Sequence, residues 1–191
     1  MSKLLFLFFI LTFFFQKKEE TYPIGQIKTA QGEILFWLYD ETPNHKKSFI
    51  ELAKGKYWDS LTFNRVIKDF VAQGGCPDTP EGFSKSPYLI KPEFNSKLRH
   101  VYGAVGAGRD NNPEKLSAGC QFYIVQNKKG LARLDDNFTV FGQVFKGMDV
   151  VDAIVNVKTD SKDAPLTPIK LDVNIIQLSS KQLREMGYSV K

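Results

Sequence analysis

The chain contains few of the residues on which covalent and metal chemistry usually depend. Its 191 residues include only two histidines, His45 and His100, and two cysteines, Cys76 and Cys120. We expect His45 on the polar side of a helix and His100 in a basic loop, each standing alone. Neither has Cys, Asp or Glu neighbours at ligand spacing, so we expect no metal site. Two cysteines do not make a disulfide framework, although they could form one bridge in an oxidising compartment.

Two familiar sequence signatures are also missing. There is no Gly-x-Ser-x-Gly elbow, and no glycine-rich loop with the spacing that cradles a phosphate. Gly103, Gly106 and Gly108 are close together, but their spacing is wrong and no strand-to-helix turn follows them. We therefore expect neither hydrolytic chemistry nor a bound cofactor.

The charged residues form no run of one sign. The net charge is +5, from 26 Lys and Arg against 21 Asp and Glu, and residues of the two signs are interspersed along the chain. A nucleic-acid partner would favour a clustered basic patch. The pattern instead indicates a solvated surface and no nucleic-acid binding.

No apolar run is long enough to span a bilayer comfortably, but one lies at the N-terminus. After Lys3, residues 4–15 are apolar except for Thr12. A bilayer span needs about 20 residues, so this run fits the hydrophobic region of a signal peptide better. Without an Ala-x-Ala-like site after it, a cleaved signal peptide and an uncleaved, membrane-attached signal anchor both remain open. We expect a leader over 1–15, a polar tether over 16–22 and one exported domain over 23–191.

The remainder of the chain alternates short strands with polar loops. Thr42 and Pro43 suit the cap and first position of a helix that Gly55 closes, and residues 147–154 predict a second helix. Most strand pairs lack a helix between them, which favours a mainly β fold with antiparallel strands in a barrel or sandwich. The expected strands are 24–29, 33–39, 61–66, 70–73, 101–107, 121–125, 139–145 and 169–178.

Three segments combine aromatic, amide and basic side chains. They read FNRVIKDFVAQGG over 63–75, GCQFYIV over 119–125 and LDDNFTVFG over 134–142. Because side chains alternate along a strand, Arg65 is expected on the same face as Phe63, and Gln121 on the same face as Tyr123. A cation and an amide could then point into one aromatic-lined groove.

These segments resemble the three signature motifs of the cyclophilin family, in the same order and with the same spacing. The likeness extends from about Gly25 to Leu178. It implies an eight-stranded antiparallel closed β-barrel capped by two α-helices, with a groove on its outer wall. It also implies a monomeric peptidyl-prolyl cis–trans isomerase whose partners are proline-containing polypeptides. A proline-binding chaperone or scaffold module with little catalysis is the alternative.

The resemblance also assigns roles to individual positions. Arg65 matches the catalytic arginine, and Gln73 and Gln121 match the amides that hold the substrate backbone. Gly108 and Arg109 match the stretch that pairs with that backbone, Arg109 through its main chain. The wall of the proline pocket is matched by Phe70, Val71, Tyr123, Leu134 and Phe138.

Several positions depart from the family pattern. Asn64 stands where many members have His, but its neighbour Arg65 is kept, so we expect activity to survive. Arg133 stands where cyclosporin-sensitive members often have Trp, so we expect weak inhibition by cyclosporin. Cys76 and Cys120 replace Asp and Ser beside the expected groove; a bridge and two unpaired thiols are both open. Asn137 begins a glycosylation motif that we interpret as chance, because a glycan there would obstruct the pocket.

The expected location follows from the leader together with the resemblance to short bacterial members of the family. We expect export to the periplasm or cell envelope. The residue preferred before proline and the physiological clients are not indicated by the sequence.

Overall fold

The structure is a computed structural model that describes residues 19–79, 81–83 and 86–188. The predicted leader over 1–15 lies outside the described residues. Within them, β1 already begins at Thr21, where Thr21 pairs with Ser179 and Tyr22 with Leu178. The expected polar tether is therefore too long at its C-terminal end, because its last two residues belong to a strand.

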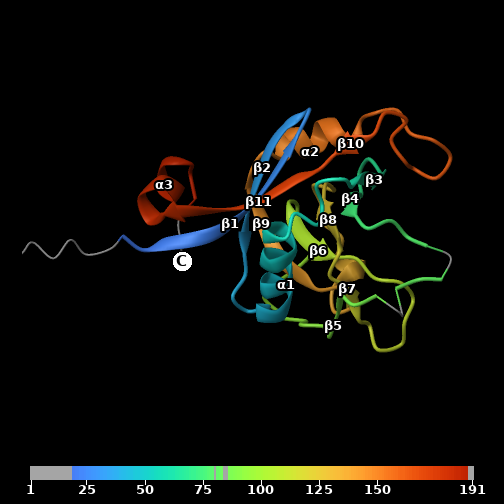
Figure 1. The fold of residues 1–191 in the computed structure, drawn as a ribbon, viewed down its shortest axis with the longest axis horizontal. Helices are drawn as coiled ribbons and strands as arrows, with labels where there is room; N and C mark the ends of the chain where they lie inside the picture. The colour runs from blue at the N-terminus through green and yellow to red at the C-terminus, as the bar shows by residue number, and fades with distance from the viewer. Residues whose placement is uncertain (1–18, 80, 84–85, 189–191) are drawn as a thin grey trace, which may run out of the picture.

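One antiparallel sheet forms the body of the molecule and curls almost into a closed barrel (Figure 1). Its order is β10-β3-β4-β8-β6-β9-β2-β1-β11. The two end strands are neighbours in the chain, separated only by Leu171, whose N–H donates to the carbonyl of Leu61 at 3.0 Å. Counted as one interrupted strand, they make the eight strands that the sequence predicted. The bounds are β1 Thr21–Thr29, β2 Gly32–Leu38, β3 Thr62–Val66, β4 Val71–Gly75, β6 Ala104–Ala107, β8 Gln121–Val125, β9 Val140–Lys146, β10 Ile169–Lys170 and β11 Asp172–Ser179.

Two predicted helices pack against the barrel. They are α1, Pro43–Lys54, and α2, Met148–Val155. A third helix, α3 over Ser180–Glu185, was not predicted; Ser179 and Gln182 start it with a capping box. A short 3-10 helix, η1 over Ala132–Leu134, and a small separate sheet of β5, Leu89–Ile90, and β7, Ser117–Ala118, were also missed.

The interior of the barrel is filled by aromatic and branched side chains. Phe36, Phe63 and Phe122 are fully or almost fully buried there, and Phe49 of α1 reaches in from outside to meet Phe36 edge-on at 5.2 Å between ring centroids. Burial of such large apolar groups is the main stabilising contribution to this fold.

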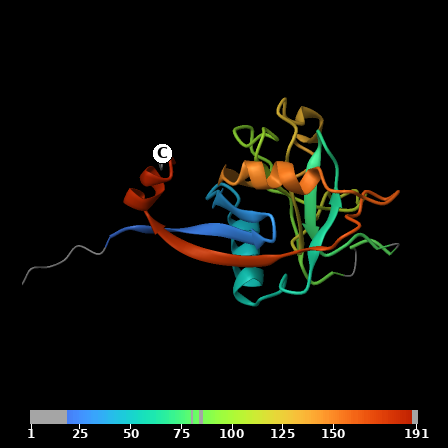
Figure 2. The same ribbon diagram turned by 90° about the horizontal axis from the view of Figure 1, so that it is seen from above.

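A two-stranded arm extends from the barrel (Figure 2). The outer halves of β1 and β11 pair with each other and lead into α3. Leu183 of α3 is fully buried, and Trp37 stacks on Tyr188 with 5.4 Å between ring centroids. The arm therefore has a small apolar core of its own.

The environment of α1 corrects two expectations. Thr42 makes no side-chain cap; instead the carboxylate of Glu93 accepts hydrogen bonds from the backbone N–H groups of Asn44 and His45. The same carboxylate lies 2.6 Å from Nδ1 of His45, which is 3% exposed. The prediction that His45 lies on a polar helix face is wrong, because the segment carrying Glu93 covers that end of the helix.

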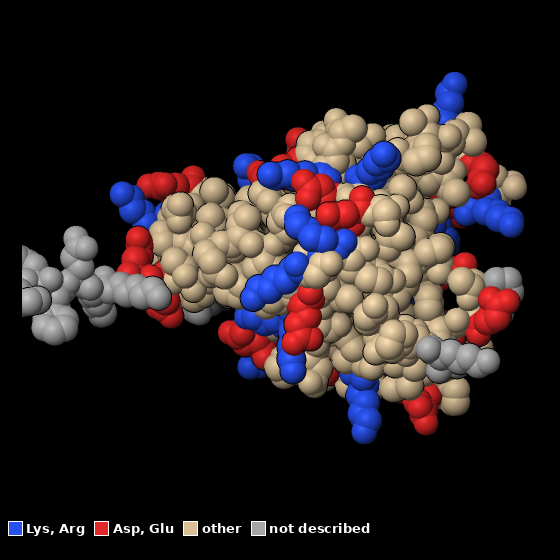
Figure 3. All heavy atoms as spheres, viewed as in Figure 1, with Lys and Arg blue, Asp and Glu red and all other residues tan. Residues whose placement is uncertain are grey.

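The surface charges are mixed on the face seen in Figure 3, where Lys and Arg side chains lie among Asp and Glu. In the part of the chain that the structure describes, no helix is long and apolar enough to cross a membrane.

Candidate active site

A pocket of about 170 Å³ opens on the outer wall of the barrel. It brings together every residue that the resemblance assigned to the site, from five separate stretches of chain, and adds Asp78. The lining residues are Arg65, Phe70, Val71, Gln73, Asp78, Gly108, Arg109, Gln121, Tyr123, Leu134 and Phe138.

Arg65 reaches this pocket because β3 contains an irregularity. Phe63 pairs with Gly74 and Arg65 with Gln73, so the register shifts across Asn64. Such a bulge breaks the alternation of side chains. Phe63 therefore points into the barrel core while Arg65 points to the outer wall, and the prediction that they share a face is wrong. Asn64 donates from Nδ2 to the carbonyl of Gly75 at 2.8 Å, which ties the bulge to β4.

The guanidinium of Arg65 is held loosely at the side of the pocket. Its Nη1 donates to Oε1 of Gln73 at 3.4 Å, and its Nε lies 3.9 Å from a carboxylate oxygen of Asp163. Its central carbon is 5.8 Å from the centroid of the Phe70 ring. An arginine carries five N–H donors. Donors are therefore left over for a group that enters the pocket.

Aromatic and aliphatic side chains form the apolar part of the pocket wall. Tyr123 and Gln121 point outward from β8 while Phe122 points into the core, as strand alternation predicts. Phe138 meets Tyr123 edge-on, with 6.1 Å between centroids. Gly106 on the neighbouring strand makes room for Tyr123, because a Cβ atom there would lie 2.3 Å from Cζ of that ring.

Arg109 contributes its side chain as well as its backbone. Its Nε donates to the backbone carbonyl of Asn137 at 3.0 Å, and its Nη2 donates to the side-chain Oδ1 of Asn137 at 2.7 Å. The guanidinium carbon of Arg109 lies 4.7 Å from the centroid of the Phe138 ring. The side chain of Asn137, which begins the glycosylation motif, is therefore engaged in orienting a pocket residue.

The opposite side of the pocket is organised around Gln121. Its Nε2 donates both to the carbonyl of Cys76 and to Oδ1 of Asp78, each at 2.9 Å. Sequence reasoning missed Asp78, since it lies in a polar loop that no periodicity describes. Its position three residues after Gly75 was the only signal available.

Cys76 and Cys120 form a disulfide beside this side of the pocket, with 5.5 Å between their Cα atoms. The N–H of Cys76 also donates to the carbonyl of Cys120 at 3.0 Å. Of the two alternatives left open by the sequence, the structure has the bridge. It links the ends of β4 and β8, directly before Gln121.

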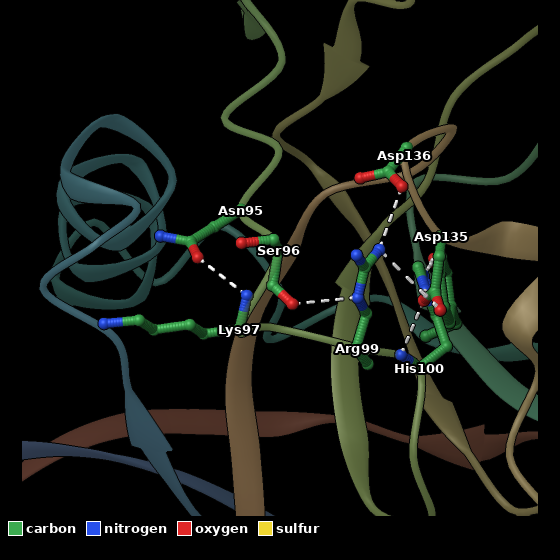
Figure 4. Close-up of polar contacts among 8 residues, drawn as sticks. Asn95, Ser96, Lys97, Arg99, His100, Asp135 and Asp136 are labelled. Carbon is green, nitrogen blue, oxygen red and sulfur yellow. Dashed lines mark hydrogen bonds and ion pairs between the residues drawn. The ribbon is translucent and has the colours of Figure 1, made fainter.

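His100 is not an isolated loop residue, which corrects a second expectation about the histidines. It is 2% exposed, its Nδ1 lies 2.7 Å from Oδ1 of Asp135, and its Nε2 lies 2.8 Å from the hydroxyl of Tyr123 (Figure 4 shows the side toward Asp135). Burial lowers the pKa of His100 below its usual 6.5, although Asp135 opposes that shift. Burial also raises the pKa of Tyr123, so its hydroxyl stays protonated.

No group of three or more His, Cys, Asp and Glu side chains suited to a metal ion occurs within the described ranges. The pocket thus offers two guanidinium groups, of which that of Arg109 is already bonded to Asn137, together with two amides, one carboxylate and an apolar surface. Such an arrangement can bind and polarise a peptide group, and it contains no side chain activated as a nucleophile.

Comparisons with known proteins agree with this architecture. A family profile described as cyclophilin type peptidyl-prolyl cis-trans isomerase/CLD matches residues 24–174. An Arabidopsis thaliana peptidyl-prolyl cis-trans isomerase is 30% identical over 81% of this chain and 94% of its own length. One from Schizosaccharomyces pombe is 35% identical over 76% of this chain and 94% of its own.

A solved structure shares the fold. It is the cyclophilin type isomerase of Cryptosporidium parvum, crystallised in the presence of the dipeptide Ala-Pro, with a TM-score of 0.69 and 22% identity. The likeness covers 82% of this chain and 99% of that one. The chain belongs to the cyclophilin-type peptidyl-prolyl cis–trans isomerase family. It is an isomerase of X-Pro peptide bonds.

Proposed function

We propose that the pocket on the outer barrel wall is where the X-Pro bond turns, and that Arg65 is the catalytic residue. The observation that carries this proposal is the position of the Arg65 guanidinium, beside Phe70 and Gln73 and above an apolar wall. The solved relative from Cryptosporidium parvum was studied with Ala-Pro. That supports a proline dipeptide unit as the group that the corresponding pocket of this chain accepts.

The proposed reaction needs no proton transfer. Rotation about a peptide bond has a barrier of roughly 18–20 kcal/mol, because the nitrogen lone pair is shared with the carbonyl. In the twisted amide this lone pair returns to the proline nitrogen, which can then accept a hydrogen bond. A guanidinium donor of Arg65 directed at that nitrogen stabilises the twisted form more than either planar form, and this difference lowers the barrier.

The other lining residues hold the substrate in place. Phe70, Tyr123 and Phe138 surround the proline ring with apolar surface, so that the ring stays fixed while the preceding carbonyl swings. Gln73 and Gln121 offer amides to the substrate backbone. Because each tenfold gain in rate requires about 1.4 kcal/mol of selective stabilisation, one well-placed charged donor accounts for a large share of the acceleration.

The test is the rate of isomerisation of a proline peptide by exchange NMR. Arg65→Ala is expected to lower kcat/KM by about 100-fold, the scale seen when one donor to a developing charge is removed. Arg65→Lys keeps the charge but loses the planar fork, so we expect an intermediate rate. Arg184→Ala, which removes an exposed arginine of α3, is the matched control. Equal rates for wild type and Arg65→Ala would end this assignment.

We also propose that the protein is exported to the periplasm or cell envelope, attached to the membrane if its leader is retained. Two features support this location: the apolar run over residues 4–15 and the Cys76–Cys120 bridge, since disulfides persist mainly in oxidising compartments. Cell fractionation followed by N-terminal sequencing tests both points. Recovery of reduced protein from the cytoplasm, with Met1 and its leader intact, would argue against export.

A further inference from the structure

One buried side chain beside the pocket has a geometry that the isomerase chemistry does not use directly. His100 lies between the hydroxyl of Tyr123 and the carboxylate of Asp135. We propose that His100 is a positioning residue for the reaction, holding the Tyr123 ring in the pocket wall through its hydroxyl and fastening that wall to the segment that carries Leu134. This inference rests on the proposed function of the pocket.

The protonation pattern follows from the partners. Hydrogen bonds from the side chain and backbone of His100 lower the pKa of Asp135 despite its partial burial, so this carboxylate is ionised and can only accept. The Nδ1 atom of His100 must then carry the proton. This leaves the lone pair of Nε2 to accept the hydrogen bond that the Tyr123 hydroxyl donates.

The backbone of His100 fastens the neighbouring wall of the pocket. Its N–H donates to Oδ1 of Asp135 at 2.9 Å, and its carbonyl accepts from the N–H of Leu131 at 2.7 Å. These two bonds bracket η1, which ends in the pocket residue Leu134. One residue thus contacts both the strand that carries Tyr123 and the turn that carries Leu134.

The charges around the ring are those of Arg99, Asp135 and Asp136. Nη1 of Arg99 lies 2.9 Å from Asp136 and 3.9 Å from Asp135 (Figure 4). Among the described residues, Tyr123 is the other titratable group in contact with the ring, which it faces from β8. Burial, with a smaller contribution from Arg99, outweighs the two carboxylates and keeps the pKa of His100 below 6.5. Above pH 6.5 the imidazole therefore accepts from Tyr123, and only at lower pH does it become a second donor.

The chain offers an unusually clean test, because it has only two histidines. His45 is also buried and also bonded to a carboxylate, but it is not among the residues that line the pocket. The experiment measures kcat/KM for a proline peptide by exchange NMR between pH 5 and 8. We expect the wild-type value to fall about fivefold as His100 gains a proton, at a pH lower than the usual 6.5 because burial lowers its pKa, and fivefold is the scale of one lost hydrogen bond. His45→Gln, the matched control, should retain this fall.

Three variants should change the profile. His100→Gln places an amide that does not titrate near the Tyr123 hydroxyl, so we expect a flat profile. His100→Ala should be less active than His100→Gln at every pH, because nothing then accepts from Tyr123. Tyr123→Phe should lower activity at neutral pH and also give a flat profile. Circular dichroism at each pH confirms that every variant is folded.

Other outcomes would overturn the proposal. The first is a decrease of kcat/KM at low pH that persists in His100→Gln or in Tyr123→Phe. The second is a loss of this decrease in His45→Gln, and the third is a wild-type kcat/KM that does not change with pH. The dissociation constant of the same peptide is measured over the same pH range. These measurements also separate the two proposals. If Arg65→Ala is fully active, the assignment of Arg65 as the catalytic residue fails. The positioning role of His100 is still supported in that case if the dissociation constant of the peptide rises at low pH in proteins that contain His100 and not in the His100 variants.

Discussion

Removal of the disulfide should weaken the fold substantially. The bridge joins residues separated by 44 positions, which includes all of β5, β6 and β7. In the chain-entropy treatment, a closed loop of this length restricts the unfolded chain by about 4 kcal/mol at 25 °C. For a chain of this size that corresponds to a loss of about 8–16 °C in Tm.

The folded state keeps other links across the same junction. The N–H of Cys76 still donates to the carbonyl of Cys120, and Nε1 of Trp58 donates to the same carbonyl at 3.0 Å. The β4–β8 pairing is therefore expected to survive reduction, so that the effect appears mainly in the free energy of unfolding.

The assay is urea unfolding followed by fluorescence, with and without a phosphine reductant, together with the Cys76→Ala/Cys120→Ala double variant. Reduced wild type and the double variant should agree with each other and unfold at a lower urea concentration than the oxidised protein. The double variant, treated with reductant, controls for effects of the reagent itself. Coincident unfolding curves for oxidised and reduced wild type would refute the reasoning, and so would two free thiols found by mass spectrometry in protein from its native compartment.

Three further predictions concern the pocket and the buried histidines. Gly108→Ala should reduce kcat/KM at least tenfold, because the added Cβ would lie 2.0 Å from Oε1 of Gln121; unchanged kinetics would contradict this packing. Thermal stability should decrease as pH falls below 6.5, since burial lowers the pKa of both His45 and His100 and the unfolded chain then binds more protons than the folded one. Equal Tm values at pH 7.5 and 5.5 would exclude that coupling. Cyclosporin should inhibit only weakly, because Arg133 replaces the Trp typical of sensitive members. The guanidinium of Arg133 lies 4.8 Å from the centroid of the Phe70 ring. A sub-micromolar inhibition constant would contradict this prediction.

The regular parts of the site could be read from the sequence because they depend on local periodicity. The alternation of β8 correctly placed Gln121 and Tyr123 on one face, and Pro43 and Gly55 correctly bounded α1. The three motifs carried the remaining assignments, since their order and spacing imply a family whose pocket is assembled from the same positions.

What the sequence could not supply were interactions between side chains far apart in the chain. The shift of register at Asn64, which turns Arg65 away from the core, depends on pairing with β4. The contact of His100 with Tyr123 and Asp135 spans 23 and 35 positions. A prediction from side-chain alternation assumes that the strand pairing has no shift in register. The hydrogen-bond partners of a buried polar group are far away in the sequence and come together only in the closed barrel. The sequence therefore determined the eight barrel strands, the two helices that pack against them and the chemistry available. The tertiary structure decided which face Arg65 presents and which groups hold the pocket in shape.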